Sequence, residues 1–532
     1  MDPKEPETGT PAAPSGGIGL AEPIFQAPKG EVTPETPKAP PGGGTPPSEP
    51  PPTAPDTIVV PPTDVQAAPK TETPVNPFVP TMPAAGAPPP AQGGNPMMRL
   101  IFILGGVILL VLLGLFIFRM VSGGGAANKE VTIIYWSLWE NDAVTRQFIA
   151  DFESTHPKIK VQYTQQSPKQ YRERLQSAIN RGEGPDVFRF HNTWIPMLRT
   201  QLAVVPADVM TPAEFSSAFF PVANNDLVAG SSIFGIPLMM DGLGLYINDE
   251  LFATAGVTPP TTWTDVINLI PRLTVKNGTA IVTSAIALGT ANNVEHFSDI
   301  LAVMFIQNGT NLKNPTGKEA EGTLIFYRKF ADPSDPLYTW SEGMDNSVGA
   351  FAAGRVAMIL APSWRAHEIA AMAPKLRFHI APIPQLQGNA VAWASYWVEG
   401  VSTKSTHQKA AWEFVKYLTS TEGATKLYTE ASKSRLFGEP YARVELANTI
   451  AEDPYLGAFV KQATYARSFP LASRTFDNGL NDKLIQYVTD GINGMAAGSS
   501  PSQVLTTVSS GFRQVLSSYG ISSDAPQTTP AP

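Results

Sequence analysis

The chain has 532 residues, 52 prolines, no cysteine and a formal net charge of −8. Without cysteine there can be no disulfide, thiolate zinc site, cysteine nucleophile or lipid-modified cysteine of a bacterial lipoprotein. The mild negative charge argues against a role in binding nucleic acid.

Residues 1–97 differ sharply in composition from the rest of the chain. They hold 27 of the 52 prolines, and 4 lysines against 10 acidic residues. A segment with so few apolar residues cannot bury enough surface to offset its chain entropy, so we expect a disordered, Pro-rich tail with polyproline II character. A plain spacer is the simpler interpretation of this tail, and a docking site for a cytoplasmic partner is the alternative.

An apolar segment follows the tail. Leu100 to Phe118 is 19 uncharged residues, 16 of them Leu, Ile, Val or Phe, between Arg99 and Arg119. As a helix it would be about 28 Å long, close to the ~30 Å hydrocarbon core of a bilayer. We therefore predict one uncleaved transmembrane anchor over residues 98–121, with a cleaved signal peptide as the alternative. The flanking charges do not decide its orientation.

A Gly-rich tether over residues 122–128 leads into the large domain, predicted over 129–520, and residues 521–532 read as a disordered C-terminus. A domain of roughly 390 residues exceeds what one hydrophobic core serves, so two lobes are expected. It opens with an apolar strand from Val131 to Tyr135. An amphipathic helix and a second strand, Ile159 to Tyr163, complete a β-α-β unit.

The alternation continues with a helix from Tyr171 to Asn180 and a strand from Val187 to Phe190. Strands and helices that alternate in this way predict a mainly parallel sheet with helices on both faces. Ligands bind such sheets at the carboxyl ends of the strands. The relevant loops carry Trp139 and Glu140 after the first strand, and His191, Asn192 and Trp194 after the third.

Several short motifs follow in a defined order. The sequence Pro259-Pro-Thr-Thr-Trp263 predicts a helix start, with Thr262 as the N-cap and Asp265 in the capping-box position. The other motifs are Gly184-Pro-Asp-Val-Phe188, Gly235-Ile-Pro237 followed by Asp241 and Leu245-Tyr-Ile-Asn248, Phe351-Ala-Ala-Gly354 with Pro362-Ser-Trp364, Lys409-Ala-Ala-Trp-Glu-Phe414, and Ser434-Arg435.

Together these motifs resemble the family 1 extracellular solute-binding proteins of ABC importers, the maltose-binding-like group, over residues 130–515. The resemblance implies a two-lobe periplasmic-binding-protein-like (type II) α/β fold with an interlobe cleft. It places lobe crossovers near 241–246 and 378–384, with a return near 430. It also implies a monomer outside the cytoplasm, with the N-terminal tail inside, that delivers its ligand to ABC permease subunits and has no catalytic residues, cofactor or metal.

A small carbohydrate is the expected ligand. Sugars present apolar faces and a rim of hydroxyls, which suit flat aromatic rings and planar polar side chains. The candidate ligand-binding residues in the matched motifs and loops are Trp139, Glu140, Asn192, Trp194, Asp241, Trp364, Tyr396 and Trp397. We assign Trp136, Trp263 and Trp412 to packing, and His191 to internal hydrogen bonding. An anionic ligand would need a cation, for which Arg435 is the one candidate.

Two other functions remain open. A membrane-anchored, glycan-processing enzyme would use paired carboxylates in the cleft. However, the sequence lacks GxSxG, HExxH and Walker A motifs, and its six histidines are scattered. A surface receptor, sensor or adhesion module would keep the binding fold without transport, and a permanent membrane tether suits that role.

Overall fold

The computed structural model describes residues 109–113, 130–388 and 390–523. Residues 109–113 belong to one unit of the chain, and all the other described residues belong to a second. The predicted tail, the tether and most of the predicted anchor lie outside the described residues. Residues 109–113 are helical, and their side chains are 52–69% exposed. None of the helices in the described ranges is long and apolar enough to cross a membrane.

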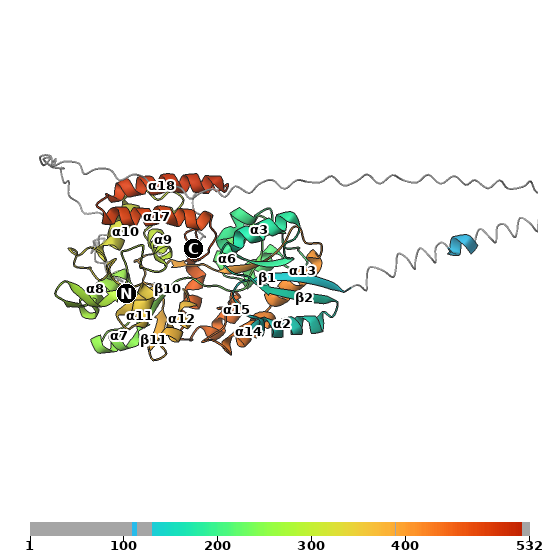
Figure 1. Cartoon of the computed structure of the whole chain (residues 1–532), viewed down its shortest axis with the longest axis horizontal. Helices are drawn as coiled ribbons and strands as arrows, with labels where there is room; N and C mark the ends of the chain where they lie inside the picture. The colour runs from blue at the N-terminus through green and yellow to red at the C-terminus, as the bar shows by residue number, and fades with distance from the viewer. Residues whose placement is uncertain (1–108, 114–129, 389, 524–532) are drawn as a thin grey trace, which may run out of the picture. The chain divides into compact units, whose positions relative to one another are not determined.

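Two five-stranded sheets organise residues 130–523 (Figure 1). The first sheet, which defines lobe 1, has the strand order β2-β1-β3-β13-β6. Its strands are β1 Val131–Ser137, β2 Ile159–Gln165, β3 Val187–His191, β6 Ile236–Pro237 and β13 Trp397–Val401. The helices of lobe 1 include α2 Asp142–Thr155, α3 Tyr171–Arg181, α6 Pro221–Leu227, α13 Gln408–Leu418 and α14 Thr421–Ser432.

The predicted β-α-β opening is confirmed. Asn141 caps α2 by accepting a hydrogen bond from the Val144 amide. Val144, Phe148 and Phe152 then recur at four-residue spacing and are buried, because this spacing puts them on one face of the helix. β1 runs parallel to both β2 and β3.

The expectation of a mainly parallel sheet is wrong for half of lobe 1. β13 pairs antiparallel with both β3 and β6. The reason is topological: β13 enters the sheet only after the chain has passed through the second lobe, so no crossover helix fixes its direction relative to β3. The local alternation of strands and helices near the N-terminus carries no information about this returning strand.

The second sheet, which defines lobe 2, has the order β11-β7-β10-β9-β8 and is also mixed. Its strands are β7 Gly244–Asn248, β8 Val275–Asn277, β9 Ala280–Ile286, β10 Val356–Ala361 and β11 Phe378–Ala381. Its helices include α8 Trp263–Leu273, α9 Phe297–Gln307, α10 Lys318–Lys329, α12 Arg365–Met372 and α16 Gly457–Gln462. The predicted capping box of α8 is present in both directions between Thr262 and Asp265.

The chain crosses between the sheets where β6 leads to β7 and where β11 leads back to β13. At the first crossing, Gly242 forms a bridge with Ala394 of the second. A Cβ on Gly242 would lie 1.8 Å from the carbonyl oxygen of Trp393, so only glycine lets the two segments approach this closely. A third passage runs between α14 and α16.

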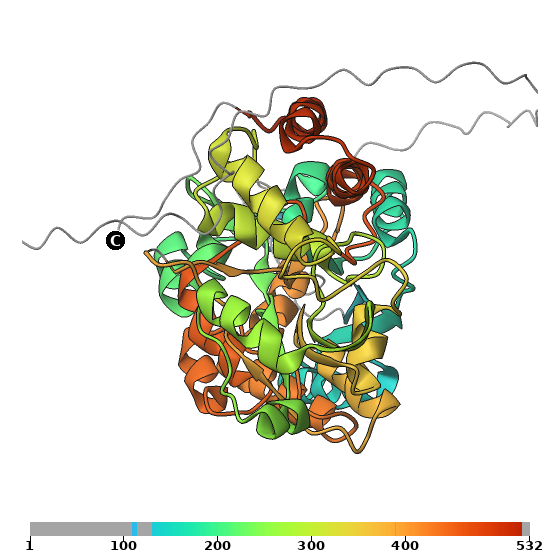
Figure 2. The ribbon, with the colours of Figure 1, turned by 90° about the vertical axis from the view of Figure 1, so that its left-hand side faces the viewer.

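Two C-terminal helices complete the domain, α17 Leu480–Ala496 and α18 Pro501–Ser518. They lie side by side and pack against α10 of lobe 2. Figure 2 looks nearly along both helix axes. In the cores, Trp263 and Trp412 are 0% and 1% exposed, which confirms their assignment to packing. Trp136 is only partly buried, and its remaining surface faces a separate hollow described below.

Candidate functional site

A cavity of about 380 Å³ lies between the two lobes. Lobe 1 contributes Trp139 and His191 from the carboxyl ends of β1 and β3, and Trp397 from the amino end of the antiparallel β13. Lobe 2 contributes the start of α12 and the loop before α9. The crossing segments close the remaining sides. Its principal lining residues are Trp139, His191, Asp241, His296, Asp299, Trp364, Arg365, Glu368, Ser395, Trp397, Arg435, Glu439, Ser473, Arg474 and Phe476.

An aromatic cluster forms the lobe 1 wall. Trp397, the first residue of β13, has its ring centroid 5.5 Å from that of Trp139 and 5.5 Å from that of Trp194. His191, at the end of β3, lies 5.1 Å from Trp397. All three contacts are edge-to-face, an arrangement that aromatic rings favour. Trp139 is the outermost member, at 37% exposure.

Trp364 of lobe 2 faces the same cavity. The Arg365 guanidinium lies over its ring at 4.2 Å, and the His296 ring meets it edge-on at 5.6 Å. Arg365 Nε donates a hydrogen bond to His296 Nε2 at 3.0 Å. Because Nε2 accepts this bond, the His296 proton is on Nδ1, which lies 2.7 Å from Ser473 Oγ. Burial and the Arg365 charge lower the pKa of His296 to about 3, so this ring is neutral.

Each arginine in the cavity already has a carboxylate partner. Arg365 binds Glu368 and, at 2.8 Å, Glu295. Arg474 binds the same Glu295 at 2.6 Å. Arg435 binds Glu439 at 2.5 Å. Because these charges are compensated within the protein, the cavity offers oriented hydrogen-bonding groups rather than a bare cation for an anionic ligand.

Two further carboxylates in the cavity have no cationic partner among the residues that the structure describes. Asp241 accepts hydrogen bonds from the Gly242 amide and from the amide and hydroxyl of Ser363. Asp299 accepts from the Trp393 indole and the Ser473 amide. Burial raises the pKa of Asp241 to about 7 and that of Asp299 to about 6, because the hydrogen bonds offset only part of the desolvation.

The cavity brings together four of the eight residues predicted from the sequence: Trp139, Asp241, Trp364 and Trp397. The other four candidates, Glu140, Asn192, Trp194 and Tyr396, do not line it. Trp194 is fully buried behind Trp397.

The polar groups of the other three are used inside lobe 1. Glu140 accepts two hydrogen bonds from the buried Arg189, at 2.6 and 2.7 Å. Asn192 and the Tyr396 hydroxyl both donate to Asp226, at 2.9 and 2.8 Å. These side chains therefore hold lobe 1 together behind the cavity wall.

Comparison with known families identifies the fold. The family described as bacterial extracellular solute-binding protein matches residues 136–425, more than half of the chain. The chain belongs to this family.

The matches between this solute-binding protein and two curated relatives cover most of each relative's length. A multiple sugar-binding protein of Streptococcus mutans is 24% identical over 314 residues, 57% of this chain and 74% of the relative. An uncharacterised lipoprotein of Streptomyces antibioticus is 24% identical over 327 residues, 59% of this chain and 70% of the relative.

Solved structures share the two-lobe fold. A cyclo/maltodextrin-binding protein in complex with maltotetraose aligns with a TM-score of 0.60 at 18% identity, covering 74% of this chain and 99% of that one. The sugar-binding protein MalE of Xanthomonas citri aligns with a TM-score of 0.59 at 20% identity, covering 73% and 98%. At these identities the likeness establishes the fold alone.

Several cavity residues of this solute-binding protein were missed in the sequence. His296, Arg474 and Phe476 all line the cavity with positive φ angles of 61°, 60° and 53°. Left-handed backbone is uncommon at residues other than glycine, and none of the recognised motifs covers these three positions. His191 does make the expected internal hydrogen bonds, to Thr193 and Ser395, but it also lines the cavity.

A metal site is not evident in the part of the chain that the structure describes. There, no group of three or more His, Asp or Glu side chains is arranged to hold a metal ion.

Proposed function

We propose that this solute-binding protein captures a neutral mono- or oligosaccharide in the cavity between its lobes, by hinge closure, and delivers it to the permease of an ABC importer. One observation carries the proposal: tryptophans from both lobes, Trp139 and Trp397 on one side and Trp364 on the other, face a single cavity of about 380 Å³. Aromatic surfaces on opposite walls suit the two apolar faces of a sugar ring.

The polar groups of the cavity support a neutral ligand. Arg365, Arg435 and Arg474 keep their carboxylate partners, and their remaining N–H groups can donate to hydroxyls. Asp241 and Asp299 can accept from hydroxyls in return. A phosphorylated or carboxylated ligand would need an uncompensated cation, and each of these three arginines is already paired.

The relatives point to the same ligand class. The Streptococcus mutans relative is named for sugar binding, and the GacH receptor of Streptomyces glaucescens, of similar fold, was solved with acarbose. We extend this ligand class to the present chain on the strength of its three cavity tryptophans.

The segment over residues 98–121 is proposed to hold the domain at the outer face of the cell membrane. The Streptomyces antibioticus relative is a lipoprotein, but this chain has no cysteine to carry a lipid. A hydrophobic helix would then replace the lipid, and the Gly-rich residues 122–128 would give the domain freedom to reach a permease.

A thermal-shift screen of the full-length chain in detergent tests the binding proposal. The panel contains maltotetraose, mannotriose, tagatose, glucose 6-phosphate, amino acids and short peptides. A ligand that binds only the folded state stabilises it by about 4 kcal/mol when present at 1,000 times its Kd. We expect a shift with one neutral saccharide class. A shift only with peptides, amino acids or the sugar phosphate would overturn the assignment.

Transport is tested separately from binding. Cells that lack the chain are expected to lose uptake of the radiolabelled saccharide identified by the screen, and uptake should return with the wild-type gene. Uptake that is unchanged, together with confirmed binding, would contradict the importer role and favour the receptor or sensor function.

A further inference from the structure

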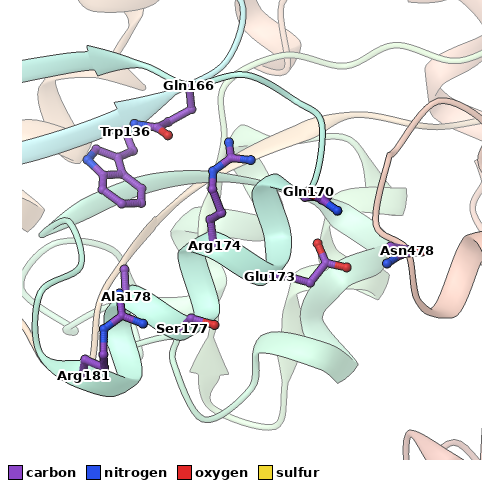
Figure 3. A pocket seen from close by; sticks show the side chains of 9 residues that line it. All are labelled: Trp136, Gln166, Gln170, Glu173, Arg174, Ser177, Ala178, Arg181 and Asn478. Atoms are coloured by element: carbon purple, nitrogen blue, oxygen red, sulfur yellow. The ribbon is translucent and has the colours of Figure 1, made fainter. Parts of the chain in front are cut away.

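A second hollow, of about 530 Å³, lies on the outer face of lobe 1 (Figure 3). Its walls are Trp136 from β1, Gln166 just after β2, one face of α3, and Asn478 from the segment before α17. In Figure 3 the Arg174 side chain rises from α3 toward Gln166, and Asn478 lies on the side away from Trp136. The hollow shares no lining residue with the interlobe cavity.

Backbone strain marks both cavities. The described residues include five non-glycine positions with positive φ. His296, Arg474 and Phe476 line the interlobe cavity, and Gln170 (56°) and Asn478 (46°) line the outer hollow. Left-handed backbone is unfavourable by roughly 1–2 kcal/mol for residues with a Cβ, and such strain clusters at functional sites. Every such position in the described residues lies at one of these two cavities.

The charged groups around the outer hollow are already engaged. Arg174 donates to the backbone carbonyls of Lys169 and, at 2.7 Å, Ser167. Arg181 pairs with Glu183 at 2.8 Å, and Glu173 pairs with Arg172 at 3.2 Å. Arg174 has no carboxylate partner among the described residues, so its charge is met only by the dipoles of two backbone carbonyls. The buried Glu173 Oε2 makes no hydrogen bond there. The N–H groups that Arg174 does not use can donate to hydroxyl groups of a neutral ligand.

The neutral polar groups of the hollow are not engaged. Within the described part of the chain, the side-chain amides of Gln166, Gln170 and Asn478 make no hydrogen bond to protein groups, and neither does the Trp136 indole N–H; Gln170 and Asn478 are exposed. Amides both donate and accept, and the indole offers a flat apolar face beside them. This combination suits hydroxyl groups arranged around an apolar ring.

We propose that the outer hollow is a second carbohydrate-binding site, which takes a neutral oligosaccharide segment. Trp136 supplies the stacking surface, and Gln166, Gln170 and Asn478 supply the hydrogen bonds. Because the hollow is open on one side, its occupant can be an internal segment of a longer chain. This site goes beyond solute capture in the cleft: it would hold the domain on a polysaccharide at the cell surface.

Affinity electrophoresis of the full-length protein in detergent tests the site, with soluble starch, mannan and a mixed-linkage β-glucan as separate probes. The cleft is disabled by combining Trp364→Ala with Trp397→Ala. We expect this double variant to remain retarded by one of the polysaccharides. Adding Trp136→Ala should weaken the remaining affinity at least 10-fold, and Trp136→Phe should largely preserve it.

Controls separate ligand binding from folding. Gln166→Ala combined with Gln170→Gly removes two amides, and the glycine suits the left-handed backbone at position 170, so this variant should fold and still lose retardation. Met372→Ala changes an exposed apolar residue of α12 and should change nothing.

Three results would overturn the proposal. The first is no retardation of the cleft-disabled protein by any of the three polysaccharides. The second is retardation unaffected by the Trp136 and Gln166/Gln170 changes. The third is that these changes abolish co-purification of permease subunits while polysaccharide retention persists, which would make the hollow a protein-docking surface. Loss of small-sugar binding in the cleft, by contrast, bears only on the function proposed above.

Discussion

Trp397 of β13 and His191 of β3 are register partners on antiparallel strands, with ring centroids 5.1 Å apart and planes at 79°. Burial lowers the pKa of His191 to about 3, so its imidazole is neutral at physiological pH. Trp397 and His191, the inner part of the aromatic wall, are thus fixed by strand pairing in lobe 1, whereas Trp139 lies on the loop after β1. A surface held this way meets a ligand without first having to be ordered.

Replacement of Trp397 by alanine tests this wall. We expect Kd for the saccharide found by the screen to rise about 10- to 100-fold, which corresponds to about 1.4–2.8 kcal/mol of lost binding free energy. The reason is loss of the ring that contacts both Trp139 and His191. Titration calorimetry gives Kd, and Trp397→Phe should retain most of the affinity. An unchanged Kd in a folded Trp397→Ala variant would remove Trp397 from the site.

A buried ion-pair network lies directly beneath this wall. Arg189 binds Glu140 at 2.6 Å and Glu399 at 2.7 Å, and all three side chains are nearly inaccessible. Burial opposes ionisation of Glu140, but the Arg189 charge outweighs it and lowers the pKa of this carboxyl. Burial raises the pKa of Glu399, whose second oxygen lacks a partner among the described residues.

Arg189→Met should therefore destabilise the protein by about 3–5 kcal/mol, because it leaves two carboxyl groups buried without their cation. Glu399→Gln should be much milder, since Glu399 is the partner that gives up its charge more readily. Urea denaturation followed by circular dichroism measures both. Arg181→Met breaks an exposed pair and serves as the control, with an expected change within about 0.5 kcal/mol. Equal losses for Arg189→Met and Glu399→Gln would contradict this account.

Sequence patterns predicted the parts of the fold that depend on interactions between residues close together in the chain, such as helix faces and helix caps. Val144, Phe148 and Phe152 identified α2 by their spacing, and Thr262 and Asp265 identified the start of α8 by their hydrogen-bonding capacity. The same reasoning failed for β13, whose antiparallel pairing is decided by a chain that returns from the other lobe.

The site was only half predictable for a related reason. Trp364 lies in the recognisable Pro362-Ser-Trp364 motif, whereas Glu140 looked like a ligand contact because its partner Arg189 lies 49 residues away in the sequence. Arg474 is held beside the cavity by its ion pair with Glu295, which lies 179 residues away in the sequence. No local sequence pattern predicts that contact.

The capping box of α8 gives a stability prediction. Thr262→Ala should lower the free energy of unfolding by about 1 kcal/mol, because the hydroxyl accepts the Asp265 amide hydrogen bond at 3.1 Å. Chemical denaturation checks the value. Thr279→Ala, in the exposed turn between β8 and β9, is the matched control and should change stability little. A Thr262→Ala variant as stable as wild type would show that the cap is not used in solution.

Asp241 gives the pH dependence of the site. Its pKa in the folded protein is about 7, against an ordinary value of 3.8, and the first cause is burial. The folded state therefore holds a proton on Asp241 that the unfolded state has released between pH 4 and pH 7. The resulting stabilisation is complete below about pH 4 and is lost as the pH rises through 7.

Asp241→Asn removes this titration, so its stability relative to wild type should improve as the pH rises from 4 to 8. Urea midpoints at intervals across that range measure the difference. Asp265→Asn should behave oppositely: hydrogen bonds from Thr262 hold the pKa of Asp265 below its ordinary value, so wild type gains its advantage as the pH rises through the acidic range. If the wild-type and Asp241→Asn curves stay parallel from pH 4 to 8, then Asp241 has the same pKa in the folded protein as in the unfolded chain and is ionised over most of this range. It would then be available as a hydrogen-bond acceptor for a sugar hydroxyl over that range.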